Sequence, residues 1–321
     1  MVFFFIGAYL FSYFLYTFGV DSVKLIIENF NLTYLSIFLA LTLIGFVPLV
    51  WRWQVILKAY NIKGRFWTLL RNTMAGYAVS YTTPVSRMGG EPVRIFMLKK
   101  ELGVNYKTGS TTVLIDRYME LLGTAAYSIM ALIVLILSPS IPLIFKIVFG
   151  IVNLIAVPII LLMLYRFMKN KGIFIMLYDF LRLYKIKKWK KFRSQLGKVD
   201  ILLAGFFVNH KKEFSLSLLL YMVSGLLWLL EFKFLLLSFG IQTSITDLIL
   251  VSTVIGLINF IPVPAHLGFL EAGQTGLFQA LRGDSSIGFA LTLLLRARYI
   301  ILVAIGYLFV AHFSLREYLK K

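Results

Sequence analysis

Residues 143–165 read LIFKIVFGIVNLIAVPIILLMLY, an apolar stretch in which Lys146 is the one charged residue. A helix of roughly 20 such residues crosses the hydrocarbon core of a bilayer, which is about 30 Å thick. Comparable stretches recur along the 321-residue chain, which is 60% hydrophobic and only 15% charged. So few charged residues cannot cover a water-soluble surface of this size, and the stretches lack the alternating polarity of a transmembrane β-barrel. The sequence therefore predicts an all-α polytopic membrane protein.

Six apolar stretches are predicted to be full transmembrane helices within a single integral membrane domain, residues 1–321. The first stretch has neither the basic start nor the small-residue cleavage site of a signal peptide, so we interpret it as a retained helix. The connections after the second and fourth stretches are basic, and basic connections lie in the cytoplasm. This predicts a multi-pass protein of the cell membrane with both termini cytoplasmic. The predicted spans are about 1–20, 32–50, 109–137, 143–165, 214–238 and 286–313.

The net charge of +19 comes from 33 basic and 14 acidic residues. Residues 166–213 hold 13 of the basic residues and three acids, and we predict a basic cytoplasmic loop there. This distribution is typical of the positive-inside pattern and of attraction to anionic headgroups, so no nucleic-acid partner is expected. Trp51, Arg52 and Trp53 are interpreted as an interface anchor at the end of the second helix.

Two further segments, 67–86 and 247–282, are apolar but interrupted by polar residues, prolines or glycines. The first has basic residues on both sides, and the topology places both ends of the second outside the cell. Because both ends of each segment are predicted to lie on the same side of the membrane, each segment is predicted to be a re-entrant hairpin. The non-helical backbone of such a hairpin is tolerated only where protein or trapped water forms hydrogen bonds with its polar groups. The residues predicted to form the hairpins are Pro84, Gly89, Gly90, Pro262, Pro264 and Gly268.

A shift of 180 positions superimposes the two interrupted segments. Pro84 then falls on Pro264 and Glu91 on Glu271, which indicates an internal repeat with halves 32–137 and 212–317. The predicted topology makes this repeat inverted. Inverted repeats with broken helices at matching positions hold a central substrate site in secondary transporters. The alternative is a duplication that was kept for packing alone.

Eight charged residues lie within or at the edge of the apolar segments. Each costs about 2.5–3.5 kcal/mol at the bilayer centre on insertion scales, so they must be paired, hydrated or close to the interface. Arg117 and Glu120 can pair on one helix face, and such a structural ion pair is the alternative to a functional site. An arginine beside a broken helix also fits a phosphate. The eight residues are Glu91, Asp116, Arg117, Glu120, Glu231, Glu271, Arg296 and Arg298.

Motifs of several enzyme classes are missing from the sequence. It contains no Walker-type Gly-Lys-Ser/Thr, no cysteine and only three histidines, none of them four residues apart. The external connections carry four scattered acids, whereas a membrane transferase would use paired ones. We therefore expect neither an enzyme nor a bound metal or cofactor, although an intramembrane transferase is the alternative.

Two stretches resemble the signatures of the lysylphosphatidylglycerol synthase transmembrane-region family. The first is YTTPVSRMGGEPVR at 81–94, followed by LIDR at 114–117; the second is PVPAHLGFLEA at 262–272. Arg296 matches the arginine expected in the last helix. Ala265 and His266 depart from the pattern, because glycines are usual at these positions.

This resemblance implies a lipid translocase. In the bifunctional bacterial members this membrane region moves aminoacylated phosphatidylglycerol between leaflets, and a separate soluble domain synthesises it. The chain looks like a stand-alone member without the synthase domain, some of which are linked to polyisoprenyl-phosphate glycolipids. A flippase or scramblase for an anionic or polyisoprenyl-phosphate lipid is thus the leading hypothesis. The substrate-binding candidates are Arg87, Glu91, Arg94, Asp116, Arg117, Glu271 and Arg296.

Two other functions stay open at this point. The chain could be an ion-coupled transporter of a small anion, or a non-catalytic membrane partner of a lipid- or glycan-modifying enzyme. A homo-oligomer is compatible with either function.

Overall fold

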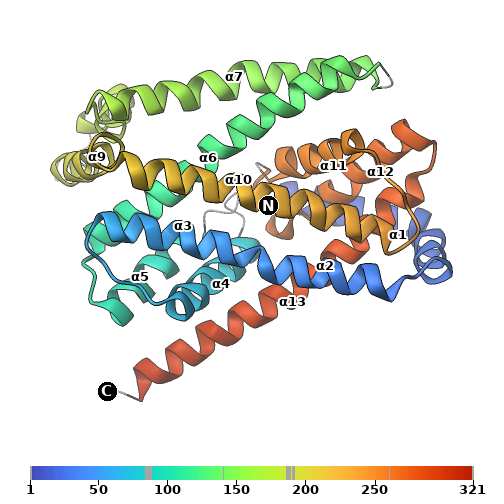
Figure 1. Ribbon diagram of the computed structural model, residues 1–321, viewed down its shortest axis with the longest axis horizontal. Helices are drawn as coiled ribbons and strands as arrows, with labels where there is room; N and C mark the ends of the chain where they lie inside the picture. The colour runs from blue at the N-terminus through green and yellow to red at the C-terminus, as the bar shows by residue number, and fades with distance from the viewer. Residues whose placement is uncertain are drawn as a thin grey trace.

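The computed structural model describes residues 2–83, 89–139, 141–185, 189, 192–259 and 261–319, and the regular elements in these ranges are all helices (Figure 1). The all-α class is therefore confirmed. The elements are α1 (Val2–Glu28), α2 (Leu32–Ile44), α3 (Phe46–Ala59), α4 (Phe66–Thr82), α5 (Glu91–Leu102), α6 (Tyr106–Leu137), α7 (Leu143–Met168), α8 (Phe174–Phe180), η1 (Leu183–Lys185), α9 (Phe192–Asn209), α10 (Lys211–Leu237), α11 (Ile245–Ile258), η3 (Pro264–His266), α12 (Phe269–Arg282) and α13 (Ser285–Tyr318).

Six helical stretches in the described part of the chain are long and apolar enough to cross a membrane. Their number and order confirm the predicted spans, and the chain is a multi-pass membrane protein. The second stretch, formed by α2 and α3, continues through residues 51–53 to Ala59 and is longer than predicted. The six stretches are Phe4–Glu28, Leu32–Ala59, Tyr106–Leu137, Leu143–Met168, Lys211–Leu237 and Ser285–Tyr318.

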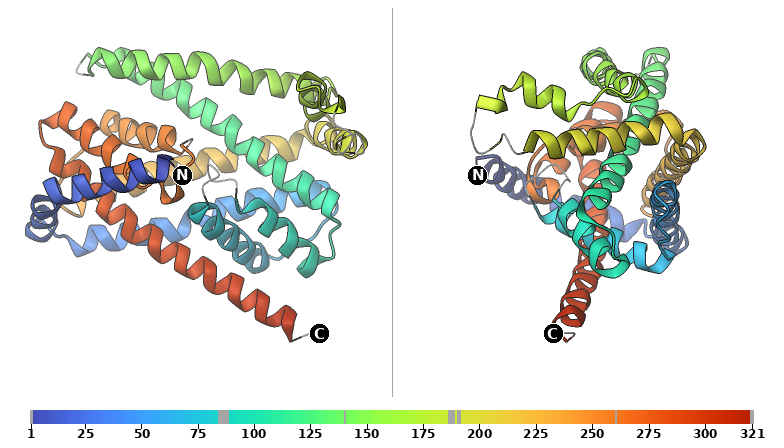
Figure 2. Two further views of the ribbon diagram at one scale, coloured as in Figure 1. Left: turned by 180° about the vertical axis from the view of Figure 1, so that it is seen from behind. Right: turned by 90° about the vertical axis from the view of Figure 1, so that its left-hand side faces the viewer.

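The long helices run along the long axis of the molecule, which gives it two distinct ends (Figures 1 and 2). One end gathers the α3–α4 and α5–α6 connections, α8, α9 and the C-terminus. We call it the basic end, because it carries most of the Lys/Arg-rich segment 166–213. The α1–α2, α6–α7 and α12–α13 connections lie at the opposite end. That the basic end is cytoplasmic stays a prediction.

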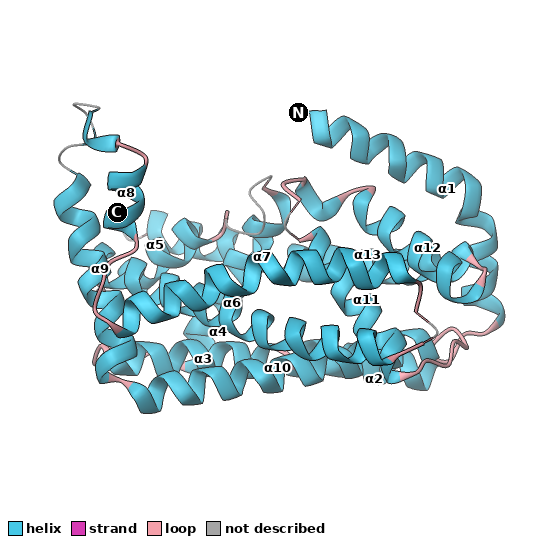
Figure 3. Cartoon of the chain, turned by 90° about the horizontal axis from the view of Figure 1, so that it is seen from above, coloured by secondary structure: helices cyan, strands magenta, loops and turns pink. Residues whose placement is uncertain are grey.

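The two pairs of short helices extend inward from opposite ends. The α4–α5 pair lies toward the basic end and the α11–α12 pair toward the other end, and the inner ends of these helices approach each other near the middle (Figures 1 and 3). The hydroxyl of Tyr81, in the last turn of α4, lies 3.5 Å from the carbonyl oxygen of Ala265 in η3. That these two pairs are re-entrant hairpins in a bilayer stays a prediction. Pro84 lies outside the described residues.

The turn between α11 and α12 uses left-handed backbone conformations. Ala265, His266 and Gly268 have φ angles of 54°, 52° and 77°. Glycine adopts this region without steric cost, whereas other residues seldom do. The expectation of glycines in this signature therefore has a backbone reason, and this chain makes the same turn with two larger residues. Gly268 also allows close contact, since a Cβ there would lie 2.0 Å from the carbonyl oxygen of Gly7 in α1.

Corresponding helices in the two halves begin and end at similar positions after the 180-residue shift. Helix α5 corresponds to α12, and each ends at a left-handed glycine, Gly103 and Gly283, both with a φ of 69°. Helix α4 likewise corresponds to α11, and α6 to α13. The elements of the two halves thus correspond in order and length, and the internal repeat stays a prediction. Its inversion across a membrane stays a prediction.

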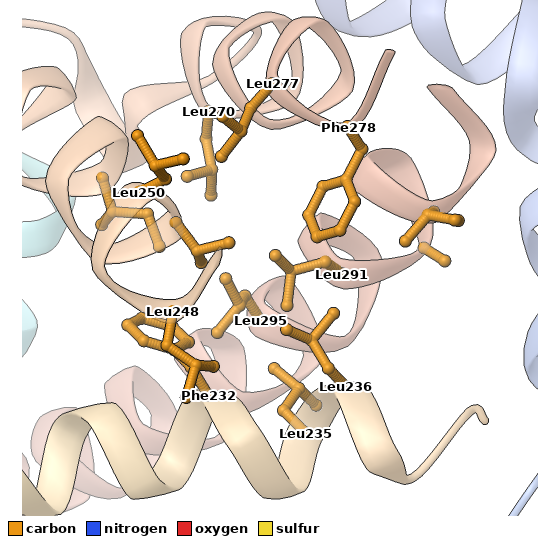
Figure 4. Close-up of a cluster of buried hydrophobic side chains, with 14 of the residues drawn as sticks. Phe232, Leu235, Leu236, Leu248, Leu250, Leu270, Leu277, Phe278, Leu291 and Leu295 are labelled. Carbon is orange, nitrogen blue, oxygen red and sulfur yellow. The ribbon is translucent and has the colours of Figure 1, made fainter. Parts of the chain in front are cut away.

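The largest buried core lies where α10, α11, α12 and α13 meet (Figure 4). Phe232 and Leu235 of α10 interdigitate there with Leu250 of α11, Phe278 of α12 and Leu295 of α13, and each of the five is at most 1% exposed. Inside a membrane such a core gains from van der Waals contact between close-packed side chains, because lipid tails are as apolar as leucine. The core therefore holds the helices α10, α11, α12 and α13 of the second half together.

The segment 166–213 is largely helical, in contrast to the predicted loop. The carboxylate of Asp200 in α9 accepts hydrogen bonds from the backbone N–H groups of Ile173 (3.0 Å) and Ile175 (2.9 Å), where α8 begins. Phe206 and Phe207 of α9 are buried against α6 and α7. These contacts hold the basic segment against the helical bundle, and a cytoplasmic position for it stays a prediction.

The absence of native cysteine allows the hairpin topology to be tested with single exposed cysteines. We expect Gln242→Cys and Ala280→Cys, which flank the α11–α12 hairpin, to react with a membrane-impermeant maleimide from the same side of oriented vesicles. Lys63→Cys and Lys107→Cys at the basic end should react from the other side. Reaction of the first two from different sides would show that the α11–α12 pair crosses the membrane.

Candidate functional site

A buried cluster of charges joins α3, α5 and α6 in the first half. The carboxylate of Asp116 accepts a hydrogen bond from Nε of Arg52 at 2.7 Å, and its other oxygen lies 2.9 Å from Nη2 of Arg94. The three residues are only 3–4% exposed. A buried carboxylate is stable only when opposite charges and hydrogen bonds replace its lost hydration, and the two arginines do so here.

The two arginines of this cluster carry one more charge than Asp116 can neutralise. Aromatic rings cover both guanidinium groups: Arg94 lies 4.1 Å from the ring centroid of Trp53, and Arg52 lies 5.5 Å from that of Tyr221. Such cation–π contacts stabilise a desolvated cation by about 2 kcal/mol. Among the described residues, Nη1 of Arg52 and Nε of Arg94 are buried without a hydrogen-bond partner. The cluster therefore keeps N–H groups that could donate hydrogen bonds to an anionic ligand.

A second set of charges adjoins the first and is more open. Nε of Arg117 donates to Glu91, and Nη1 of Arg117 donates to Glu120 at 2.6 Å. The Arg117 and Glu120 side chains are 24% and 34% exposed. The predicted pair of Arg117 with Glu120 is thus present, and Glu91 at the start of α5 extends it to the hairpin. Together the two sets join three arginines to three carboxylates.

The second half contains a comparable ion pair beside its own hairpin. Nη2 of Arg296 in α13 donates to Glu271 at 2.8 Å, and Nη1 donates to the carbonyl oxygen of Ala265 at 3.3 Å. Glu271 also accepts from the backbone N–H of Gly268 at 2.9 Å, so it caps the start of α12. In both halves a glutamate at the start of the inner short helix is thus paired with an arginine of the following long helix. Glu91 and Glu271 are related by the 180-residue shift.

A third ion pair lies between the long helices. Nη2 of Arg298 in α13 donates to Glu231 in α10 at 3.1 Å, and the hydroxyl of Thr42 in α2 also donates to Glu231. Glu231 is only 4% exposed. Arg296 and Arg298 therefore use different faces of α13, as their spacing predicts.

Aromatic rings meet between the inner end of α4 and the turn at η3. The ring of Tyr81 lies 5.1 Å from that of Tyr299 and 6.3 Å from that of His266, between centroids. His266 is buried in the turn, with 8% exposure. This contact links the inner end of α4 to the turn that Arg296 holds.

The candidate substrate-binding residues fall into two groups. The structure brings Glu91, Arg94, Asp116 and Arg117 together in the first half, and Glu271 and Arg296 in the second. Arg87 lies outside the described residues. No group of three or more acidic or histidine side chains in the described part of the chain is placed to hold a metal ion. Binding of a substrate by these residues stays a prediction.

Arg52 belongs to the buried cluster but is not among the residues predicted to form the site. Its interpretation as part of an interface anchor is wrong, because α3 continues to Ala59 and places Arg52 and Trp53 in the interior, at 3% and 0% exposure. The partner of Arg52 is Asp116, 64 positions away, and no local spacing indicates that contact. One sequence signal could have indicated a buried role for Arg52: it lies next to an apolar stretch, and no acidic residue lies within one helical turn of it.

The fold and the buried charges define a polytopic helical membrane protein with ion-paired groups between two broken helix pairs. Comparison with known proteins agrees with this class. A family model described as lysylphosphatidylglycerol synthase TM region matches residues 1–306, and the chain belongs to this family. The UPF0104 membrane protein PH1989 of Pyrococcus horikoshii is 26% identical over 276 residues, which cover 80% of this chain and 81% of that protein. No solved structure matches the chain.

Loss of the Asp116 carboxylate should strongly destabilise the protein. Asp116→Asn leaves two buried guanidinium groups without a counter-charge, and breaking a buried pair in this way costs about 3–5 kcal/mol. The exposed pair of Asp179 with Arg193, whose closest atoms are 3.1 Å apart, gives the matched control. Asp179→Asn should change the stability by at most about 1 kcal/mol, because exposed pairs contribute little.

Thermal unfolding of the detergent-solubilised protein measures both effects. Equal unfolding temperatures for Asp116→Asn and the unaltered chain would show that the buried cluster does not hold the fold together.

Proposed function

We propose that the protein is a lipid translocase, a flippase or scramblase, that moves a charged, phosphate-bearing headgroup between the two hairpins. The observation that carries this proposal is the presence of buried arginine–carboxylate pairs beside both hairpin turns, one set in each half. Membership of the lysylphosphatidylglycerol synthase TM region family supports it. No synthase activity is proposed.

The chemistry of a passing headgroup fits arginines that are already paired. A guanidinium group binds carboxylate and phosphate with the same planar set of N–H donors. A phosphate that reaches Arg117 or Arg296 can replace Glu91 or Glu271 as the partner of the arginine, and water that enters with the headgroup must then hydrate the displaced carboxylate. Such an exchange keeps the headgroup bound through polar contacts at a depth where an isolated charge costs several kcal/mol. The carboxylates then restore the resting pairs after release.

The packing of the two halves is unequal, which supports alternate opening. Helix α13 packs closely on α4: a Cβ at Gly306 would lie 2.5 Å from the carbonyl oxygen of Met74, and the hydroxyls of Thr82 and Tyr307 are 2.5 Å apart. The corresponding helices α6 and α11 make far less contact. Tyr127, the counterpart of Tyr307, donates instead to Met222 in α10.

If the close packing of α4 on α13 were lost while α6 and α11 came into close contact, a central site would open first to one side of the membrane and then to the other. Inverted repeats work in this way in transporters. The unequal packing therefore agrees with one of two states of a translocation cycle.

The buried carboxylates near the hairpins favour transport over catalysis. Asp116, Glu91 and Glu271 each accept from an arginine in the structure. A general acid or base must exchange a proton with a reacting group within hydrogen-bond reach, and carboxylates held by arginine are poor candidates for this role. We therefore propose a transporter that performs no covalent step.

Reconstitution into liposomes tests the proposal. The unaltered protein should accelerate the exchange between leaflets of a fluorescent phosphatidylglycerol or a labelled polyisoprenyl phosphate, measured by dithionite quenching or an equivalent surface reaction. Arg296→Gln and Glu91→Gln should slow this exchange at least about tenfold, since a lost hydrogen bond to a charged group costs about 1.5–3 kcal/mol. Arg282→Gln is the control, because Arg282 pairs with Asp247 at 3.0 Å away from both hairpin turns.

Three outcomes contradict the proposal in different ways. No acceleration for any anionic lipid rejects a translocase. Uptake of a soluble anion under an ion gradient, without lipid exchange, favours the small-anion transporter. Equal rates for the arginine, glutamate and control variants would place the path away from the paired charges and favour a partner role for this membrane region.

A further inference from the structure

A cavity of about 360 Å³ opens at the basic end, away from the paired charges near the hairpin turns. It lies where α4 begins and where α5 and α13 end, next to the α3–α4 connection. This volume is within the range of small-molecule sites, about 300–1,000 Å³. The cavity is large enough for a phosphate with its attached polar group.

The walls of this cavity carry a surplus of positive charge. Five cations line it against two acids. Two of the cations have ion-pair partners: Arg71 lies 3.6 Å from Glu101, and Lys100 lies 3.3 Å from Glu317. The other three, in the part of the chain that the structure describes, have no acidic group within ion-pair distance. These three are Lys63, Arg65 and Arg316.

Helix ends explain only some of these cations. Lysine and arginine are favourable in the last turn of a helix, where carbonyl groups are unpaired, and this accounts for Lys100 in α5 and Arg316 in α13. Lys63 and Arg65 lie just before the start of α4, where the dipole disfavours cations. The first turn of α4 has no acid, and Arg65 at its N-cap makes no capping hydrogen bond. An anion in the cavity would compensate both the cations and the helix start.

The expected depth of the cavity in a membrane points to a lipid as the source of that anion. Exposed apolar side chains occur close to the cations in sequence: Trp67, Leu315 and Tyr318 are 71%, 59% and 76% exposed. Helix α13 has 34 residues and is therefore about 51 Å long, which exceeds the hydrocarbon core of about 30 Å. Its last turns thus reach headgroup depth, where aromatic side chains contact both acyl chains and water.

We infer that this cavity is a binding site for the phosphate of an anionic phospholipid. Lys63, Arg65 and Arg316 bind the phosphate oxygens, and Thr68 offers a hydroxyl beside them. Basic pockets of this kind between membrane helices recognise anionic headgroups. The site is separate from the paired charges near the hairpins. Lipid binding there does not depend on whether the protein moves lipid between leaflets.

Native mass spectrometry of the full chain in detergent tests this site. The probes are dioleoyl phosphatidylglycerol, dioleoyl phosphatidylcholine and glycerol 3-phosphate, each added separately. The unaltered chain should retain phosphatidylglycerol in preference to phosphatidylcholine. The variant Lys63→Gln/Arg65→Gln/Arg316→Gln should bind phosphatidylglycerol at least about tenfold more weakly, because it removes three charge-assisted contacts.

The matched control is Lys198→Gln/Lys211→Gln/Lys212→Gln. It removes three exposed lysines from the same end, outside the cavity, and should leave binding unchanged. Helix content and gel-filtration profiles identify any variant that fails to fold. If the triple variant fails to fold, Arg65→Glu, which changes one exposed side chain, replaces it and should also bind phosphatidylglycerol more weakly.

The possible results separate the site from the proposed transport. Loss of preference in the cavity variant alone, with or without an effect on lipid exchange, supports the site. Equal binding by the cavity and control variants overturns it. Equal retention of glycerol 3-phosphate and phosphatidylglycerol overturns the assignment to lipid and leaves a site for soluble phosphates. No preference of the unaltered chain for phosphatidylglycerol rejects the site directly.

Discussion

The need to compensate every buried charge governs this structure. Isolated ionised groups are too costly in an apolar interior, and here the buried carboxylates of Asp116, Glu231 and Glu271 are held by arginines from other elements. Asp116 of α6 takes arginines from α3 and α5, Glu271 of α12 takes one from α13, and Glu231 of α10 takes another. The positions of these helices relative to one another therefore depend on electrostatic pairing as well as on packing.

The ion pairs also explain how short, interrupted helices keep their places. A helix pair that stops in the middle of the molecule leaves backbone groups at its turn without helical partners. Glu271 accepts from the backbone N–H of Gly268, while Arg296 binds the carbonyl of Ala265, so one ion pair satisfies both sides of that turn. The arginine of a long helix thus fixes the turn of a short one, and movement of either changes both.

The same arrangement connects structure to the proposed transport. In the proposed exchange a phosphate takes the place of a carboxylate as the partner of an arginine. The packing of α4 on α13 is closer than that of α6 on α11, so the two halves are not packed alike. The cavity at the basic end has another character, because three of its cations lack acidic partners among the described residues. The proposed passage of a headgroup belongs to the first region, and the proposed stable binding to the second.

The sequence by itself determined the features that depend on local order. Apolar length gave the six spans, proline and glycine marked the interrupted segments, and a three-residue spacing predicted the pair of Arg117 with Glu120. Only the tertiary structure decided the partners of Arg52 and Arg298, which lie 64 and 67 positions away in sequence. Pairing across such separations depends on which helix faces meet, and packing of whole helices sets those faces. For that reason an arginine interpreted as an interface anchor proved to be part of the buried cluster.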